Sequence, residues 1–243
     1  EMLRSLVGSE MCIRDRNDGG YDYLSPNNPV LMYYEYGFHT SWTGENSLIG
    51  LYDEDDLRLQ AYFQRRYNKS GNSRNPTYYT GQYHPHKYDQ RSGTNYSSQA
   101  WRTPELYLNL AEAYAQKASG VSNDAIELLN QLRIKKYLSG SPNAEKQTSD
   151  FATKDDLINF IWQERRRELC FEEIMRFWDM RRQGMPSVEH RLFNSPKDYT
   201  VYRLNTGSPN YVLPIPEDET SYNNAIENNQ REVIASSSQG TLE

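Results

Sequence analysis

Glu164 and Glu168 stand one helical turn apart in a stretch whose other residues follow an apolar helical pattern. Two carboxylates at this spacing could serve as the acid and the base of glycoside hydrolysis. Three consecutive arginines at 165–167 would keep both carboxylates ionised, which disfavours a general acid with a raised pKa. The residues therefore favour a structural role for the pair, and we do not expect the protein to be an enzyme.

The helix that must position these glutamates is expected to begin after Thr153, which can cap it ahead of an acidic first turn. No glycine or proline follows until Gly184, so the pattern predicts a helix that continues past residue 175. At about 100° per residue, both glutamates fall in the middle of one apolar arc. That arc consists of Leu157, Phe160, Ile161, Phe171 and Met175.

Carboxylates on a core-facing arc are costly unless they are paired and hydrogen-bonded. Arginine suits this role because its planar fork matches a carboxylate. We expect the partners to be Arg165 from the same helix or Arg133, Arg176 or Arg181 from elsewhere. The predicted structural ion-pair network comprises Glu164, Glu168, Arg165, Arg176, Asp179 and Arg133.

Two further helices are predicted, one from Thr103 to about Gly120 and one from Ser122 or Asn123 to about Leu138. The short turn between them predicts an antiparallel pair, which resembles a tetratricopeptide hairpin. The residues expected to be buried are Leu106, Leu110, Ala113 and Tyr114 on the first helix and Ile126, Leu129 and Leu132 on the second.

Composition excludes several classes of function. The 243 residues carry a formal net charge of −6, which argues against nucleic acid and against an anionic membrane surface as partners. No apolar run approaches the roughly 20 residues that span a bilayer. Aromatic residues make up 13% of the chain and include 20 tyrosines, whose flat rings and polar tips suit sugar faces as well as loop packing.

The densest aromatic and polar region lies at residues 33–46, where Trp42 stands among polar and glycine residues without apolar periodicity. Sugar recognition needs rings that stack on the sugar face and a few convergent polar groups. We expect Trp42 to be an exposed stacking residue; the alternative is a tryptophan that anchors a loop in the core. The candidate ligand-binding residues are Trp42, Tyr36, Tyr34, Phe38 and Asn46. Trp162 and Trp178 fall on predicted helices, where core packing is expected.

Metal and thiol chemistry is weakly represented. His84 and His86 lack further ligands at fixed spacing, so no metal site is expected there. The acidic run 53–56 lacks the spacing of a calcium loop and is better explained as the N-terminus of a short helix within 53–66. Cys170 is expected to be a small buried apolar residue. No cofactor is expected.

Four segments together resemble a known family, in the order in which the family carries them. They are Asp55–Arg58, Trp101–Tyr114, Glu164–Arg182 and Tyr211–Pro216, the last followed by the asparagine-rich residues 223–229. The family is SusD/RagB, the surface glycan-binding lipoproteins of Bacteroidetes outer membranes. Leu57 stands where the family's Asp-Pro-Arg motif has proline, and Ile174 and Met175 replace a glycine and a polar residue of many members. The resemblance extends over about residues 24–234.

This resemblance implies a mainly α fold, SusD-like, with tetratricopeptide-type helical hairpins and long irregular aromatic-rich loops. It also implies non-catalytic capture of an oligosaccharide or polysaccharide at the cell surface and its delivery to a SusC-like TonB-dependent transporter. The family's ligand sites use loop aromatics that precede the Asp-Pro-Arg motif, which favours the Trp42 region. The alternatives are a helical-repeat scaffold for protein–protein interaction and a glycoside hydrolase that uses Glu164 and Glu168.

The first 16 residues resemble a translated sequencing adapter and lack the apolar core of a signal peptide. Residues 17–243 are then expected to be a C-terminal SusD/RagB-like half, with the lipidated cysteine of the anchor on a missing N-terminus. Its expected parts are a loop-rich ligand region at 17–100, a helical core at 101–184, an irregular closing region at 185–234 and a frayed tail at 235–243.

Overall fold

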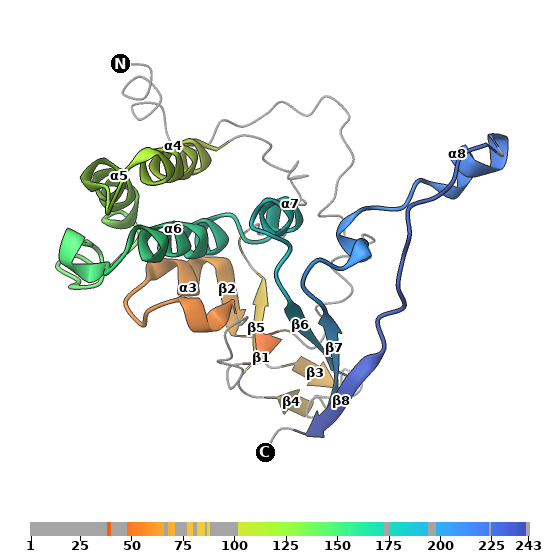
Figure 1. The fold of residues 1–243 in the computed structure, drawn as a ribbon. Helices are drawn as coiled ribbons and strands as arrows, with labels where there is room; N and C mark the ends of the chain where they lie inside the picture. Colours follow the sequence, from red (N-terminus) through yellow and green to blue (C-terminus); the bar gives the residue numbers. More distant parts are fainter. Residues whose placement is uncertain are drawn as a thin grey trace, which may run out of the picture. The chain divides into compact units, whose positions relative to one another are not determined.

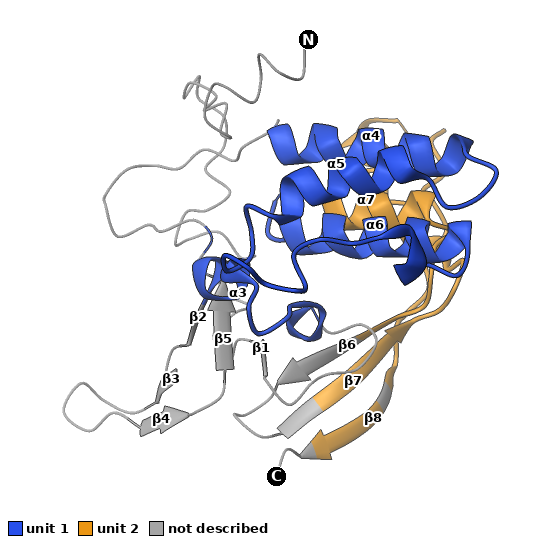
Figure 2. Ribbon diagram, turned by 90° about the vertical axis from the view of Figure 1, so that its left-hand side faces the viewer, with its two compact units in different colours: residues 1–173 blue, residues 174–243 orange. Residues whose placement is uncertain are grey.

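The computed structural model describes residues 38–39, 48–65, 68–70, 77–79, 82–85, 87, 102–172, 175–193, 198–223 and 225–241. The chain divides into two compact units, Glu1–Glu173 and Ile174–Glu243, which Figure 2 shows in different colours. Helices account for most of the regular structure, so the prediction of a mainly α fold is confirmed (Figure 1). Within the described part of the chain, every helix is too short or too polar to cross a membrane.

Three helices form the centre of the first unit. They are α4 (Thr103–Lys117), α5 (Asn123–Arg133) and α6 (Lys154–Glu168). The Ser122 hydroxyl caps α5 by accepting from the Ala125 amide. Thr153 and Asp156 form a reciprocal capping box at the start of α6, as the sequence predicts for an acidic first turn. A 3-10 turn, η3 (Thr148–Asp150), precedes that box.

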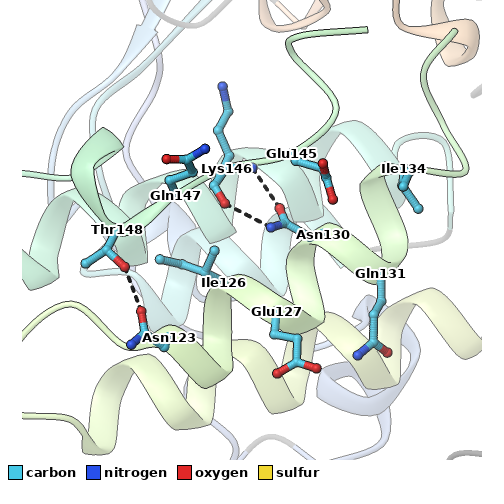
Figure 3. Close-up of a pocket in the computed structure, with 10 residues that line it drawn as sticks. All are labelled: Asn123, Ile126, Glu127, Asn130, Gln131, Ile134, Glu145, Lys146, Gln147 and Thr148. Atoms are coloured by element: carbon cyan, nitrogen blue, oxygen red, sulfur yellow. Dashed lines mark hydrogen bonds between the residues drawn. The ribbon is translucent and has the colours of Figure 1, made fainter. Parts of the chain in front are cut away.

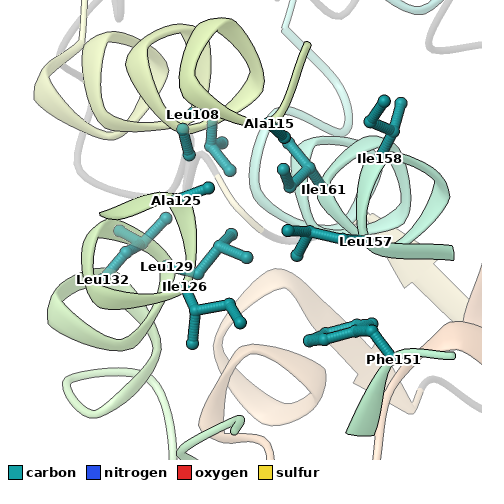
Figure 4. Packing of buried hydrophobic residues seen from close by; sticks show 11 residues of the cluster. Leu108, Ala115, Ala125, Ile126, Leu129, Leu132, Phe151, Leu157, Ile158 and Ile161 are labelled. Carbon is teal, nitrogen blue, oxygen red and sulfur yellow. The ribbon is translucent and has the colours of Figure 1, made fainter. Parts of the chain in front are cut away.

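The core lies where these three helices meet (Figure 4). From α5 it takes the predicted residues Ile126, Leu129 and Leu132, and from α6 it takes Leu157, Ile158 and Ile161. The contribution of α4 differs from the prediction, because Leu108, Ala111 and Ala115 are buried while Leu106 and Tyr114 are each 39% exposed. Apolar residues cover most of the circumference of α4, and the side with alanines lets α5 and α6 approach most closely.

The helix that carries Glu164 ends at Glu168, and α7 begins only at Met175 and ends at Arg182. The prediction of one helix through residue 175 is therefore wrong. Phe171 takes a left-handed conformation with φ of 64°, and its ring packs edge-on against Phe63 at 5.4 Å between centroids. Side chains from distant segments bind the carbonyl oxygens at the helix end, with Tyr52 donating to Arg167 O at 2.7 Å and Lys87 to Cys170 O at 3.2 Å.

Shorter elements complete the first unit. After η1 (Ile49–Leu51), Asp56 caps the short helix α3 (Leu57–Tyr62). This helix is shorter than the one expected within 53–66, because β2 (Phe63–Arg65) begins directly after it. β5 (Gln82–Pro85) pairs antiparallel with both β1 (Phe38–His39) and β2. A separate antiparallel pair joins β3 (Asn68–Ser70) to β4 (Thr77–Tyr79).

The second unit contains α7 and an antiparallel sheet of order β6-β7-β8, formed by β6 (Val188–Phe193), β7 (Asp198–Leu204) and β8 (Ser236–Thr241). Residues 235–243 were expected as a frayed tail, but β8 pairs with β7 from Asp198↔Thr241 to Tyr202↔Ser236. Between β7 and β8 the chain passes through η4 (Pro209–Tyr211) and α8 (Glu217–Tyr222). Backbone pairing therefore orders the C-terminal segment, a long-range effect that local composition does not reveal.

Candidate functional site

The predicted aromatic ligand site falls almost wholly on residues that the structure does not describe. Tyr34, Tyr36, Trp42 and Asn46 lie outside the described residues. Phe38 lies in β1, where its backbone is paired opposite Tyr83 of β5. The chemistry that the structure does describe is centred instead on Glu164 and Glu168.

Arg58 and Asp56 form a bidentate pair at the start of α3. Arg58 Nε donates to Asp56 Oδ1 at 3.0 Å, and Nη2 donates to Oδ2 at 2.8 Å. The same carboxylate caps α3 by accepting from the Arg58 backbone amide at 2.9 Å. The Asp56 side chain is completely buried and that of Arg58 is 2% exposed, so this pair is a fixed internal feature.

The remaining Arg58 nitrogen joins this pair to α6. Arg58 Nη1 donates to Glu164 Oε1 at 2.7 Å and to Glu168 Oε2 at 3.2 Å. Both glutamate side chains are completely buried. Two motifs that are far apart in the sequence, 56–58 and 164–168, therefore meet through one guanidinium group.

Further cations surround the two glutamates. Glu164 Oε2 accepts from Arg133 and from Arg167 Nη2, the latter at 2.7 Å. Glu168 Oε1 accepts from Arg102 Nη2 at 2.6 Å and from the Tyr62 hydroxyl at 3.2 Å. Lys136 lies 3.4 Å from the same oxygen. Arg102 and Lys87 also both bind Glu172. We call this group the buried ion cluster; its residues are Asp56, Arg58, Lys87, Arg102, Arg133, Lys136, Glu164, Arg167, Glu168 and Glu172.

The cations of the buried ion cluster keep the carboxylates of Glu164 and Glu168 ionised. Burial alone raises the pKa of Glu164, but the nearby Arg58, Arg167 and Arg133 outweigh it and hold that pKa well below its usual range. Burial likewise opposes ionisation of Glu168, yet Lys136 and Arg58 lower its pKa overall. Two ionised carboxylates that are sealed from solvent and bound by several donors are poorly suited to exchange protons with a substrate. This geometry supports a structural role for the pair.

The structure places the predicted ion-pair residues in different surroundings. Arg133 contacts Glu164 directly. Arg165 donates instead to Asn109 at 2.7 Å and to Glu105 at 3.2 Å, both on α4, because it leaves α6 on a different side from the glutamates. Arg176 and Asp179 lie in the second unit, where Asp179 accepts from Arg182 Nε at 2.9 Å.

Local sequence does not identify several residues of the buried ion cluster. Arg58 lies in the Asp55–Arg58 segment, but nothing near it in the sequence connects it with the glutamates. Arg102, Lys87 and Lys136 carried no local signal, because each reaches Glu168 or Glu172 from a segment that is distant in sequence or outside a helix. The sequence offers one indication that further cations are present. The carboxylates predicted to be buried are more than a single guanidinium group can bind.

Comparison with known proteins identifies the family of the chain. The model of the SusD family matches residues 32–231, which is most of the chain. The chain belongs to the SusD family. The matched range includes both the Asp55–Arg58 segment and α6, which the bond from Arg58 to Glu164 joins within the buried ion cluster.

Two solved structures have a similar fold. One is a SusD superfamily protein from Parabacteroides distasonis ATCC 8503, with 18% identity and a TM-score of 0.51 over 82% of this chain and 46% of that one. The other is a SusD-like carbohydrate binding protein from Bacteroides vulgatus ATCC 8482, with the same identity and TM-score over 82% of this chain and 45% of that one. This SusD-family chain thus spans less than half the length of either structure. Comparison with curated proteins found no match.

The two described tryptophans differ from each other in environment. Trp162 is partly buried against the core, and its indole N–H donates to Glu112 at 2.8 Å. Trp178 on α7 is 49% exposed, so the expectation of core packing is wrong for this residue. An eight-residue helix with arginines on several sides cannot bury every aromatic residue that it carries.

A pocket of about 590 Å³ opens between α5 and residues 145–148 (Figure 3). Asn130, one of the residues that line it, bonds both the N–H and the carbonyl of Lys146, at 2.8 and 2.9 Å. Six of the ten lining residues carry an amide or a carboxylate, and no aromatic ring is among the residues that line this pocket. It therefore lacks the stacking surface that the predicted sugar site requires. Among the described residues, no group of three or more His, Cys, Asp or Glu is arranged to hold a metal.

Proposed function

We propose that this protein binds an oligosaccharide or polysaccharide without transforming it. The observation that carries the proposal is membership of the SusD family over residues 32–231. The name of the Bacteroides vulgatus structure, a SusD-like carbohydrate binding protein, supports the same ligand class. The buried ion cluster adds support, because its two central glutamates are inaccessible and ionised rather than placed for glycoside hydrolysis.

We infer that the sugar stacks on Trp42, with Tyr34, Tyr36, Phe38 and Asn46 nearby to supply further ring surface and hydrogen bonds. In the cell, the whole protein would be held at the outer-membrane surface by a lipid anchor and would deliver its glycan to a SusC-like TonB-dependent transporter. The buried ion cluster would contribute indirectly, by fixing the helices from which the ligand loops extend.

Affinity electrophoresis against a panel of soluble polysaccharides tests the ligand and the site together. We expect at least one glycan to retard the wild-type chain and the Trp42→Ala variant to lose that retardation. Trp178→Ala is the matched control, because it removes an exposed tryptophan that lies outside the proposed site. Equal loss in both variants would contradict the assignment to Trp42. Absence of retardation by any glycan, in a chain shown to be folded by circular dichroism, would contradict glycan binding by this chain.

The transporter partner needs a separate test. The full-length lipidated protein, purified from outer membranes in mild detergent, should retain a TonB-dependent transporter that mass spectrometry identifies. A point variant that abolishes glycan binding should leave this association intact. Recovery of the lipoprotein without a transporter would contradict the proposed delivery step while leaving glycan capture unaffected.

A further inference from the structure

Phe38, one of the residues of the proposed glycan site, lies in the strand β1, which is only two residues long. In the described sheet β1-β5-β2, β1 is an edge strand that pairs with β5 through Phe38↔Tyr83 and His39↔Gln82. A strand of two residues forms too few backbone hydrogen bonds to fix its own position. The place of the Phe38 backbone therefore depends on what holds β5.

Lys87 holds the end of β5 against the end of α6. It lies two residues beyond Pro85, which is the last residue of β5. Its ammonium group donates to the carbonyl oxygens of Glu168 and Cys170, the latter at 3.2 Å, and pairs with the carboxylate of Glu172. The side chains of Lys87 and Glu172 are 4% and 3% exposed, so solvent and salt weaken this ion pair very little.

The neighbouring strand β2 is fixed at the same place. Its first residue, Phe63, pairs with Pro85 and is 2% exposed. Tyr62, directly before it, donates its hydroxyl to Glu168 at 3.2 Å. The Lys87 ammonium group lies 4.4 Å from the centre of the Tyr62 ring, which is a cation–π contact. Lys87 and Tyr62 therefore hold β5 and β2 together at one end of the sheet, beside Glu168.

We propose that Lys87 is a positioning residue for glycan binding, because it fixes β5 against the end of α6 and β5 in turn fixes the backbone of Phe38. This inference rests on the proposed function, since Phe38 belongs to the proposed site. When the binding-competent arrangement of a protein is populated for only part of the time, the apparent affinity falls by that fraction. Without the Lys87 anchor, the affinity for glycan should therefore fall although no residue of the proposed site is changed.

Lys87→Met tests this role, because methionine keeps an unbranched side chain but lacks the ammonium group. Isothermal titration calorimetry would use whichever of soluble starch, xylan, galactomannan or laminarin retards the wild-type chain most. We expect the dissociation constant to rise about tenfold, as it would if the competent arrangement were populated for one tenth of the time. Lys154→Met removes a lysine that binds the end of α4 instead, and it should leave the dissociation constant unchanged.

The outcomes separate this inference from the proposed function. If the wild type and Lys87→Met bind the same polysaccharide equally well, Lys87 does not position the site and the proposal is overturned while glycan binding stands. If Lys154→Met loses as much affinity as Lys87→Met, the loss is not specific to the β5 anchor and the proposal is also overturned. If the folded wild type binds none of the four polysaccharides, the proposed function itself is contradicted for these glycans, and the inference falls with it.

Hydrogen exchange distinguishes positioning from a general loss of stability. Without polysaccharide, mass spectrometry should show faster exchange in peptides that contain residues 38–39 and 82–85 of Lys87→Met than in those of the wild type. The same polysaccharide at saturation should restore the wild-type rate, because it selects the competent arrangement. Exchange in α4 should be alike in both proteins. If saturation leaves the exchange fast, or if α4 loosens equally, Lys87 only stabilises the fold and the proposal is wrong.

Tyr62→Phe is a milder variant that keeps the ring beside the Lys87 ammonium group. It removes the hydroxyl that donates to Glu168, so we expect the dissociation constant to rise about twofold to threefold, in line with the loss of one hydrogen bond. Exchange of residues 82–85 should increase in the same direction. This variant decides the question if circular dichroism shows that Lys87→Met does not fold. Affinity and exchange equal to those of the wild type would then overturn the proposal.

Discussion

Arg58 Nη1 donates to Glu164 Oε1 across 2.7 Å, although the two residues lie 106 positions apart in the chain. The other side of the same guanidinium group is fully engaged by Asp56. Arg58 therefore joins the start of α3 to the C-terminal part of α6, and each of the three charged groups depends on the others for its charge balance. Removing one member leaves a buried charge without its partner, which is far more costly than losing an exposed pair.

The first prediction concerns Glu164 itself. Glu164→Gln keeps the shape of the side chain but removes the charge that faces Arg58, Arg133 and Arg167. We expect the free energy of unfolding to fall by about 3–5 kcal/mol, because buried guanidinium groups lose their counter-charge. Urea unfolding followed by circular dichroism measures this change. The exposed Glu145→Gln is the control and should stay within about 0.5 kcal/mol of the wild type.

The second prediction tests whether the planar geometry of the Arg58 guanidinium group is needed in addition to its positive charge. Arg58→Lys keeps one positive charge but cannot bind Asp56 and Glu164 at once, because an ammonium group has no planar fork. We expect a loss of about 1.5–3 kcal/mol, the usual value of a hydrogen bond to a charged group. Arg203→Lys is the matched control, since Arg203 pairs with Glu189 on the surface with 56% and 29% of the two side chains exposed. A surface pair contributes at most about 1 kcal/mol. Equal losses would show that the fork is not needed.

The third prediction concerns acid. The pKa of Glu164 and that of Glu168 are both lowered in the folded protein. Between the folded and the unfolded pKa, the unfolded chain binds more protons, so stability falls as pH falls through this window. The contribution is complete above the ordinary glutamate pKa of about 4.3 and is lost progressively below it. Urea midpoints measured from neutral pH to pH 3 should therefore drop, and Glu164→Gln should flatten the drop. An unchanged slope in the variant would assign the acid sensitivity to other groups.

Local sequence signals were sufficient for part of this architecture. Ser122 and Thr153 cap helices as expected because capping depends on residues only a turn apart. The burial of Glu164 followed from helical periodicity. The end of α6 at Glu168 could not be predicted, since no glycine or proline marks it and the residues that bind its carbonyl oxygens, Tyr52 and Lys87, are supplied by tertiary structure. The same reason hid Arg102 from the sequence analysis, and the predicted Trp42 site stays a prediction.

The fourth prediction uses two lysines that bind helix ends. Lys87 donates to the carbonyls of Glu168 and Cys170 at the end of α6, and Lys154 donates to those of Gln116 and Ala118 at the end of α4. We expect Lys87→Met to speed hydrogen exchange at the Leu169 amide, which bonds Arg165 O at 2.8 Å. Lys154→Met should leave Leu169 unchanged and speed exchange at the Ala118 amide instead. If either variant loosens both ends equally, the effect is global and the capping role is refuted.

The last prediction concerns the two extended segments on either side of α8. Asparagine side chains join them: Asn228 accepts from Ile215 N at 2.8 Å and donates to Ile215 O at 3.0 Å, while Asn229 donates to Leu213 O at 2.7 Å. A side-chain amide can satisfy one backbone N–H and one C=O at once, so each substitution removes a specific connection. Because these bonds are exposed, Asn228→Ala should loosen the segments without unfolding the sheet β6-β7-β8.

Limited proteolysis with a glutamate-specific protease measures that loosening, since Glu217, Glu219 and Glu227 lie in or beside the connection. Asn228→Ala should be cleaved several-fold faster there than the wild type. Asn223→Ala is the control, because the Asn223 side chain accepts from Ala225 two residues later and, among the described residues, does not join the two segments. Equal cleavage of the two variants would mean that sequence proximity to α8, and not the Asn228 bridge, sets the cleavage rate. If only Asn228→Ala is cleaved faster, then the Asn228 side chain holds the two segments together. It would do so as backbone hydrogen bonds do between paired strands.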